Sequence, residues 1–355
     1  MGKICSYALW NNKGGVGKST ITFHLATRYA ELHPKTKVLV VDMCPQSNAS
    51  MILFGGGEHG ENIVLDLSAT QPAAKTVTGY IASVLDGGSG APLPTWSDFV
   101  VRAHDYNASV ADNLFVLSGD GNLEPMAPLI SDRASQVPLT AGSHPWAWVH
   151  LIIRRLLEDI AAGDDEWMFF IDTNPSFSIY TEIAISAVDR MIVPVNADDA
   201  SRVATRAMFT LIHGAHPPHP IYGQYTYAAK ADLQSIERPK VHLVVGNRLT
   251  QHAGPAAAFR AMSDATADEL FGEYQTHPHR FSTRDNAPDN REAFRDEYSV
   301  PLRDFNTAGV VAAHLGRPLS LLNGATHMVY GQEVQVQQAR IQDCRTAIDA
   351  IVGRL

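Results

Sequence analysis

A glycine-rich segment near the start of the chain constrains the fold more than any other feature. It reads Asn12-Lys13-Gly14-Gly15-Val16-Gly17-Lys18-Ser19-Thr20. An apolar run from Ile4 to Trp10 precedes it and predicts a buried strand, while helical spacing follows from Ser19 to Glu31. Glycines let the backbone curl so that successive N–H groups point at phosphate oxygens, and the next helix adds its positive N-terminal end. This context predicts a phosphate-binding loop made by Gly14, Gly15, Val16, Gly17, Lys18, Ser19 and Thr20.

Two side chains of this loop suit a nucleoside triphosphate. Lys18 is placed to reach the β- and γ-phosphates, and the Ser19 hydroxyl is placed to ligate Mg²⁺. The spacing Lys-Gly-Gly-x-Gly-Lys-Ser modifies the common Gly-x-x-x-x-Gly-Lys-Ser pattern but keeps its physics. The alternative is a glycine-rich turn with an incidental lysine. Three glycines, two lysines and Ser-Thr in register favour the phosphate loop.

Strand-like and helix-like segments alternate along the chain, which predicts an α/β fold with a mostly parallel sheet flanked by helices on both faces. We expect a helix from His150 to Ala161, and strands at Lys37 to Asp42, Asn113 to Leu117, Trp167 to Asp172, Met191 to Val195 and Val241 to Val245. Two strands end in an acid, Asp42 and Asp172. Because nucleotide sites form outside the carboxyl ends of such strands, both acids are candidate site residues. The alternative for each is a helix N-cap.

Composition narrows the class of protein. The chain has 355 residues, 45% of them apolar, with a net charge of −9, which suits a large core and does not indicate a polyanion partner. Its 3 cysteines form no Cys-x-x-Cys pair, so neither zinc nor a disulfide framework is supported. No signal peptide is recognisable, and no apolar run approaches the roughly 20 residues that span a bilayer. A cytoplasmic location is expected.

We expect one nucleotide-binding domain over residues 1–355, with variable elaborations near 213–239 and 252–299. A C-terminal helix is predicted over 333–355 because four apolar residues recur at heptad spacing: Val334, Ile341, Ile348 and Leu355. That helix could pack on the domain or lie on a membrane surface. It lacks Phe and Trp anchors and has only three basic residues, which favours core packing.

The early lysine of the loop, Lys13, gives it a resemblance to the deviant Walker A motif of the ParA/MinD family of ATPases. The resemblance implies an ATP-dependent homodimer in which Lys13 reaches the partner's phosphates. Asp42-Met43-Cys44-Pro45-Gln46 is similar to the family's Asp-x-Asp-Pro-Gln, with Cys44 in place of the second acid. By this likeness Asp42 positions the attacking water. Asp172 resembles the Walker B acid, which holds Mg²⁺ through water.

Two later segments extend the resemblance, which runs from about Ile4 to Leu322. Val245-Gly246-Asn247-Arg248 looks like the family segment whose asparagine bonds adenine, which implicates Asn247. Val300-Pro301-Leu302-Arg303-Asp304 resembles the loop on the other side of the base, which implicates Pro301 and Asp304. Each segment could also be only a strand end and a turn. The resemblance implies ATP and Mg²⁺ as ligands, with slow, partner-stimulated hydrolysis that uses Lys13, Lys18 and Asp42.

Three functions are compatible with such a protein. The first is a ParA-like partition or positioning ATPase that binds non-specific DNA with ATP and is stimulated by an adaptor on its cargo. The second is a MinD-like switch on a membrane or protein scaffold, and the third is a metabolic relative such as an amidoligase. A DNA surface needs clustered basic residues. The candidates are Arg280, Arg284, Arg291, Arg295, Arg303 and Arg317, but interspersed acids make a mixed, solvated surface the competing interpretation.

Overall fold

The computed structural model describes residues 4–138, 140, 143–215, 217–247, 256–302 and 306–355. Its main sheet has the strand order β3-β4-β2-β5-β1-β6-β7-β8. All neighbouring pairs are parallel except β3 with β4, which confirms the predicted fold class. In sheet order the strands are β3 (Val101–Arg102), β4 (Leu114–Leu117), β2 (Lys37–Met43), β5 (Trp167–Thr173), β1 (Ser6–Leu9), β6 (Arg190–Asn196), β7 (Lys240–Asn247) and β8 (Ser299–Pro301).

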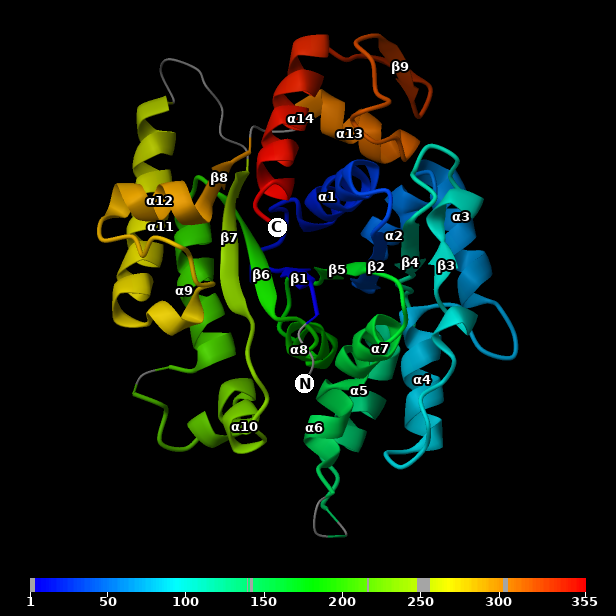
Figure 1. The fold of residues 1–355 in the computed structure, drawn as a ribbon, viewed down its shortest axis with the longest axis vertical. Coiled ribbons are helices and arrows are strands. Elements are labelled where there is room, and N and C mark those ends of the chain that lie inside the picture. Colours follow the sequence, from blue (N-terminus) through cyan, green and yellow to red (C-terminus); the bar gives the residue numbers. More distant parts are fainter. Residues whose placement is uncertain (1–3, 139, 141–142, 216, 248–255, 303–305) are drawn as a thin grey trace.

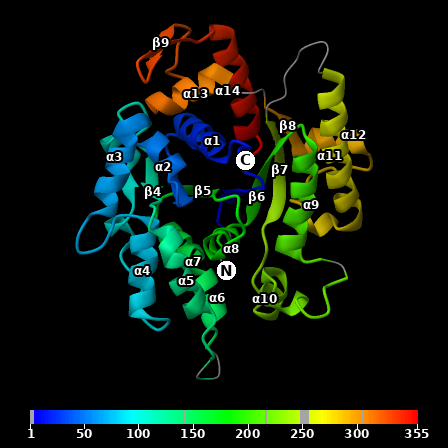
Figure 2. The same cartoon turned by 180° about the vertical axis from the view of Figure 1, so that it is seen from behind.

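Helices cover both faces of this sheet, as Figures 1 and 2 show from opposite sides. One face carries α1 (Lys18–Leu32), α2 (Asn48–Leu53), α3 (Gly57–Ser68), α13 (Asn306–Leu315) and α14 (Gln338–Val352). The opposite face carries α4 (Val77–Gly87), α5 (Leu123–Ala134), α6 (Pro145–His150), α7 (Ile152–Ala161), α8 (Ile179–Ser186), α9 (Asp199–His213), α10 (Tyr227–Leu233), α11 (Ala256–Thr276) and α12 (Arg291–Tyr298). Four 3₁₀ turns complete the described helices: η1 (Trp96–Asp98), η2 (Ala103–Asp105), η3 (Gly223–Tyr225) and η4 (Pro278–Arg280).

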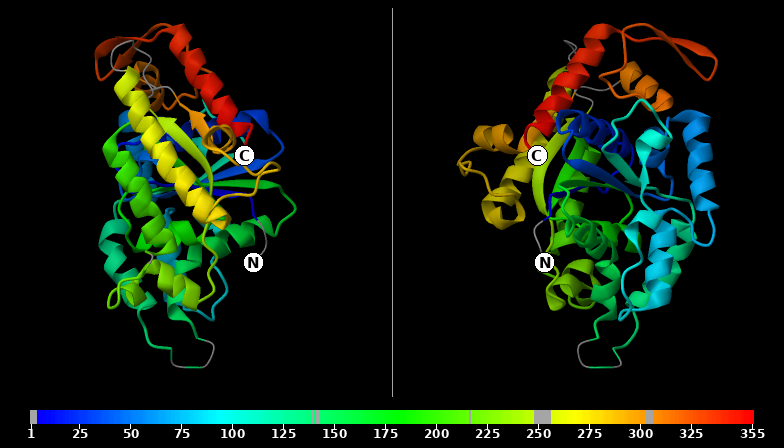
Figure 3. Two further views of the ribbon diagram at one scale, coloured as in Figure 1. Left: turned by 90° about the vertical axis from the view of Figure 1, so that its left-hand side faces the viewer. Right: turned by 45° about the vertical axis from the view of Figure 1, so that its right-hand side comes forward.

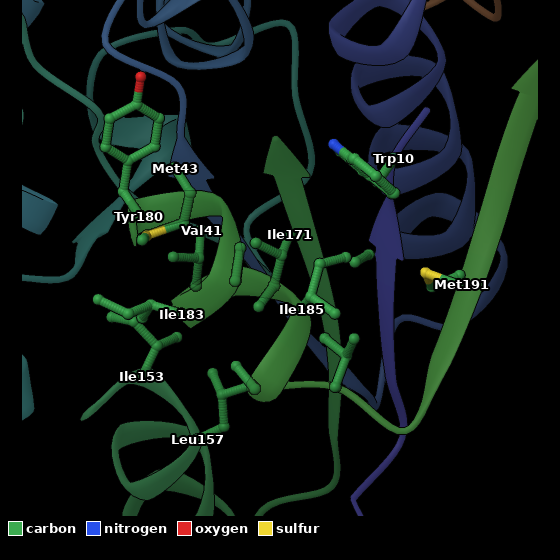
Figure 4. Close-up of a cluster of buried hydrophobic side chains, with 14 of the residues drawn as sticks. Trp10, Val41, Met43, Ile153, Leu157, Ile171, Tyr180, Ile183, Ile185 and Met191 are labelled. Atoms are coloured by element: carbon green, nitrogen blue, oxygen red, sulfur yellow. The ribbon is translucent and has the colours of Figure 1, made fainter. Parts of the chain in front are cut away.

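The alternation of side chains along each strand explains the two-layered core. In β2, Val38 and Val40 belong to the cluster on the α1 face, whereas Leu39 and Val41 belong to the opposite cluster. Figure 4 shows part of the second cluster, in which Val41 lies near Ile183 of α8. The same alternation carries Asp42 to the face that α1 covers. The strand sequence therefore both buries the sheet and directs the acid toward the loop that begins α1.

The C-terminal segment corrects one sequence-based prediction. The helix begins at Gln338 and not at Glu333, because residues Gln332–Gln335 form β10, which pairs antiparallel with β9 (Thr326–Val329). Val334, counted in the heptad pattern, lies in that hairpin. The helix itself packs on α1, where the Arg28 guanidinium donates to Asp349 at 2.5 Å. Its apolar face is thus covered by the protein, as the lack of membrane anchors suggested. No helix in the described part of the chain is long and apolar enough to cross a bilayer.

The two elaborations contain regular structure rather than loops alone. Residues 213–239 include η3 and α10, and residues 252–299 include the long helix α11, η4 and α12. Figure 3 shows α11 running along the side of the molecule beside the edge of the sheet formed by β7 and β8. Aromatic side chains of α11, of α12 and of the residue that follows η4 pack together there, including Tyr274, Phe294 and Phe281. The sequence indicated only elaborations here, because the family resemblance is weakest across these two segments.

A buried histidine on α1 leads to a prediction about acid stability. His24 is fully buried, and desolvation lowers its pKa from 6.5 to about 3. The unfolded chain therefore takes up a proton below about pH 6.5 that the folded protein excludes, so stability falls as pH drops through that range. Between pH 8 and pH 5 we expect His24→Gln to lose about 2 kcal/mol less unfolding free energy than the wild type, by urea denaturation. His33→Gln, at an exposed site, should behave as wild type; equal losses for both variants would contradict the assignment.

Candidate nucleotide-binding site

The loop between β1 and α1 has the backbone that a phosphate cradle requires. Gly15 and Gly17 have φ values of 71° and 84°, in the left-handed region that favours glycine. Neighbouring strands fix the start of the loop, because the Asn11 side chain donates to the Pro194 carbonyl at 2.7 Å and the Trp10 indole donates to the Asn174 carbonyl at 3.0 Å. The glycines of the motif are thus used for curvature, as the sequence predicted.

Lys18 lies at the centre of this loop and is buried, with 7% of its surface exposed. Its ammonium donates to the backbone carbonyls of Asn11 at 3.4 Å and Lys13 at 3.1 Å. Desolvation lowers its pKa, and the charge of Asp172 opposes that effect. A buried ammonium that donates to loop carbonyls beside the cavity is well placed to donate to a phosphate oxygen.

The two strand-end acids lie opposite each other. Asp42 and Asp172 are directly paired in the β2–β5 register, and both are fully buried. The Asp172 carboxylate accepts hydrogen bonds from Ser19 Oγ at 2.6 Å and Thr22 Oγ1 at 3.0 Å. Burial, and then the charge of Asp42, raise the pKa of Asp172 to about 7. A carboxylate beside a serine hydroxyl is a donor set that suits Mg²⁺, so the arrangement fits the predicted metal residues. Sequence reasoning missed Thr22, although it lies one helical turn after Lys18.

Asp42 is held by the segment that follows β2. One carboxylate oxygen accepts from Ser50 N at 2.9 Å and Ser50 Oγ at 2.8 Å, while the other accepts from Cys44 N at 3.0 Å. Burial raises the pKa of Asp42 to about 6, against these hydrogen bonds. Burial also raises the pKa of the Cys44 thiol to about 12, so this residue stays neutral where the family pattern has an acid. Ser50 was not predicted, because nothing in the sequence pairs it with Asp42.

A glycine beside Asp42 provides a test of this geometry. A Cβ on Gly119 would lie 2.8 Å from the Cys44 carbonyl oxygen and 3.1 Å from Asp42 Cγ. Under the ATPase role that the loop's resemblance implies, we expect Gly119→Ala to displace Asp42 and to lower ATP hydrolysis about tenfold, while ATP affinity changes less than about threefold. Gly121→Ala is the matched control, since a Cβ there meets nothing within 4 Å. Equal hydrolysis by the two variants would show that the position of Asp42 does not limit the reaction.

A cavity of about 710 Å³ opens over the loop. Its size falls in the range of small-molecule sites, and its loop wall is formed by Gly14, Gly15, Gly17, Lys18, Ser19 and Thr20. The cavity is also lined by residues that the sequence analysis did not assign to the site, among them Gln46, Asn48, Glu61 and Tyr330. Tyr330 belongs to the β9–β10 turn, about 310 residues from the loop in sequence, and no local pattern signals it. Asp42 does not line the cavity; Cys44 does.

Lys13 points away from the centre of its own loop. Its ammonium forms an ion pair with Asp198, the residue that caps α9, and lies 3.4 Å from Ser201 Oγ. The two side chains of the ion pair are 22% and 42% exposed. Asp198 was not predicted as a site residue, because it follows β6 and is distant in sequence. The structure therefore places Lys13 at the rim of the site.

The predicted base-binding residues lie partly outside the described residues. Asn247 ends β7, and Pro301 is an exposed residue that ends β8. The register pairs Gly246 with Pro301, so these two strand ends are adjacent. Asp304 and Arg303 fall outside the described part of the chain. The adenine contacts stay a prediction.

The candidate arginines of the DNA surface are mostly neutralised within the protein. Arg280 pairs with Glu273, Arg291 with Asp268 at 2.7 Å, and Arg295 with Asp264 at 2.8 Å. The Arg284 guanidinium donates to a backbone carbonyl and lies 4.8 Å from the centre of the Tyr298 ring. Arg317 is exposed. These contacts favour the mixed, solvated surface over a continuous basic patch in one protomer.

These features define a P-loop nucleotide-binding protein: a mostly parallel sheet, a loop with glycines at positive φ, a buried lysine, and a serine hydrogen-bonded to an aspartate. The sequence model of the CobQ/CobB/MinD/ParA nucleotide binding domain matches residues 7–322, and the chain belongs to this family. The family predicted from the loop is confirmed. No curated protein matches the chain.

Solved structures share the fold over their whole length. Apo McdA from Cyanothece is 15% identical, with a TM-score of 0.57, and the match covers 99% of this chain and 100% of McdA. An ATP complex of a Cyanothece McdA variant is also 15% identical, with a TM-score of 0.57 and coverage of 100% and 98%. A putative plasmid partition protein from Borrelia burgdorferi bound to AMPPNP is 13% identical, with a TM-score of 0.54 and coverage of 99% and 100%. At these identities the likeness shows the fold alone.

Proposed function

We propose that the protein is a ParA-like partition or positioning ATPase, which dimerises with ATP and hydrolyses it to ADP and phosphate. The observation that carries the proposal is the loop itself, in which Lys18 is buried beside the cavity while the Lys13 side chain is partly exposed and pairs with Asp198. This difference supports a role for Lys18 at the phosphates of its own protomer and for Lys13 at those of a second copy. The names of similar structures support it, since they include a plasmid partition protein with AMPPNP and McdA with ATP. A cytoplasmic location is part of the proposal.

Each residue of the site has a separate role in the proposed hydrolysis. Loop N–H groups and Lys18 bind and orient the phosphates, and Lys13 of the second protomer adds positive charge at the rim. Ser19 and Asp172 would hold Mg²⁺, which supplies charge neutralisation at the phosphate oxygens when bound. Asp42 would orient the attacking water. Asp42 is buried, is held by hydrogen bonds from Ser50 and Cys44, and does not line the cavity. The segment after β2 would therefore rearrange to bring its carboxylate to the cavity.

Binding of non-specific DNA by the ATP state, and stimulation by a cargo-bound adaptor, complete the proposal. We would measure binding of a fluorescent random-sequence duplex with ATP and with ADP, using Asp42→Ala to retain the ATP state. Salt-sensitive binding only with ATP is expected, since phosphate contacts release counterions and the basic surface would be completed by the dimer. Binding in neither state, despite ATP-driven dimerisation, would contradict the DNA function and favour a membrane or protein scaffold. Activity that requires a small-molecule acceptor would instead indicate an amidoligase.

A further inference from the structure

We infer that Asp198 holds Lys13 within its own protomer and so restrains formation of the ATP dimer. The inference rests on the proposed function, in which Lys13 acts on the phosphates of a second copy of the chain. It adds a positioning residue to the site. The observation that carries it is the ion pair between a loop lysine and a carboxylate that lies 185 residues away at the start of α9.

The two carboxylate oxygens of Asp198 have separate partners. Oδ1 accepts a hydrogen bond from Ser201 N at 2.7 Å and thereby caps α9, while Oδ2 binds the Lys13 ammonium. Ser201 Oγ reinforces the arrangement, because it accepts from Asn196 N at 3.0 Å and lies 3.4 Å from Lys13 Nζ. Burial acts to raise the pKa of Asp198, but the hydrogen bonds from Lys13 and Ser201 lower it below its usual value. The acceptor is therefore ionised, and the end of β6 and the start of α9 hold it in place.

An ammonium paired with this carboxylate must leave it to serve a phosphate of the partner. The dimer thus forms at the expense of two ion pairs, one in each protomer. Both side chains are partly exposed, so each pair contributes modestly and biases the equilibrium without blocking it. Such a restraint shifts the equilibrium toward separate protomers, and the phosphates of a partner's bound nucleotide compete with Asp198 for Lys13.

Asp198→Asn separates the two tasks of this residue, because asparagine also caps helices but carries no charge. Asp199→Asn is the matched control, since Asp199 is the exposed neighbour in the same first turn and the change in net charge is identical. We would measure the dimer dissociation constant by sedimentation with Mg²⁺ and AMPPNP. Asp198→Asn should dimerise about three- to tenfold more tightly than the wild type, while Asp199→Asn should match the wild type.

A second background tests whether Asp198 acts through Lys13. In Lys13→Ala the ion pair is already gone, so adding Asp198→Asn should leave the dissociation constant unchanged, whereas a purely structural role would persist. Asp198→Ser, which also caps helices, should reproduce the tighter dimer if asparagine perturbs the fold. Equal dimerisation of Asp198→Asn and Asp199→Asn, or weaker dimerisation of Asp198→Asn, would overturn the inference.

A measurement on the nucleotide-free protein separates failure of the restraint from failure of the proposed function. Acetic anhydride acylates free amines, so Lys13 should react several-fold faster in Asp198→Asn than in the wild type or Asp199→Asn, by peptide mass spectrometry. Unchanged acylation would show that the ion pair is absent and would overturn the inference directly. A different outcome is faster acylation of Lys13 in Asp198→Asn while neither this variant nor the wild type dimerises. That result would contradict the ATP dimer of the proposed function, and the inferred restraint on dimer formation would fail with it.

Discussion

Lys18→Ala is expected to abolish measurable ATP hydrolysis and to weaken ATP binding by about 30- to several-thousand-fold. The reason is that Lys18 is a buried ammonium whose present partners are two loop carbonyls, so its truncation removes the charge that would meet the phosphates. Loss of one partner from a buried charge pair costs about 2–5 kcal/mol, which corresponds to that range of affinity. Isothermal titration with ATP and Mg²⁺, together with a phosphate-release assay, measures both effects.

The control for this substitution is Lys35→Ala, because Lys35 is exposed and lies outside the loop. It removes the same charge and should leave ATP affinity and hydrolysis at wild-type values. Thermal unfolding of both variants without nucleotide shows whether Lys18→Ala is folded. A folded Lys18→Ala variant that binds ATP as tightly as Lys35→Ala would contradict the assignment of the phosphate loop.

The sequence predicted the sheet and the loop because both are encoded by local patterns. Buried parallel strands appear in a sequence as short apolar runs. The strand predicted from Lys37 to Asp42 is β2 in the structure, where it ends one residue later, at Met43. The loop glycines are constrained by their own backbone, as the positive φ values of Gly15 and Gly17 show. Strand-end acids could be placed because parallel strands bring their carboxyl ends together at one edge of the sheet.

Residues that act through contacts between distant segments could not be predicted in this way. Asp198 pairs with Lys13 across 185 residues of sequence. Ser50 is only 8 residues from Asp42, but no periodic spacing links the two residues. A short β-hairpin can also contain residues that fit a helical repeat. Val334 continues a heptad pattern yet lies in a hairpin strand, because β9 and β10 pair through their backbones. For the arginines of α12 the sequence left open a basic cluster or a mixed surface, because their acidic partners, Asp264 and Asp268, lie on a different helix, α11.

The buried position of Asp42 makes its substitution the most informative test of the mechanism. Asp42→Ala should lower ATP hydrolysis by about 10²–10⁴-fold, the range for loss of a side chain that assists proton transfer or positions water. ATP affinity should stay within about threefold, because Lys18, Ser19 and the loop amides are untouched. Rapid-quench measurement of phosphate formation gives the rate of hydrolysis, and isothermal titration with ATP gives the affinity.

Ser50→Ala shows whether Asp42 acts as a carboxylate or only as an anchor for the segment after β2. It removes one of the two hydrogen bonds that Ser50 donates and leaves the charge of Asp42 in place. If the carboxylate orients water after the segment rearranges, loosening this tether should leave hydrolysis within about tenfold of the wild type. A loss close to that of Asp42→Ala would show that the Ser50 hydroxyl tether is itself required and would contradict the water-positioning role. The backbone amides of Ser50 and Cys44 still donate to Asp42 in this variant, so its carboxylate stays in place.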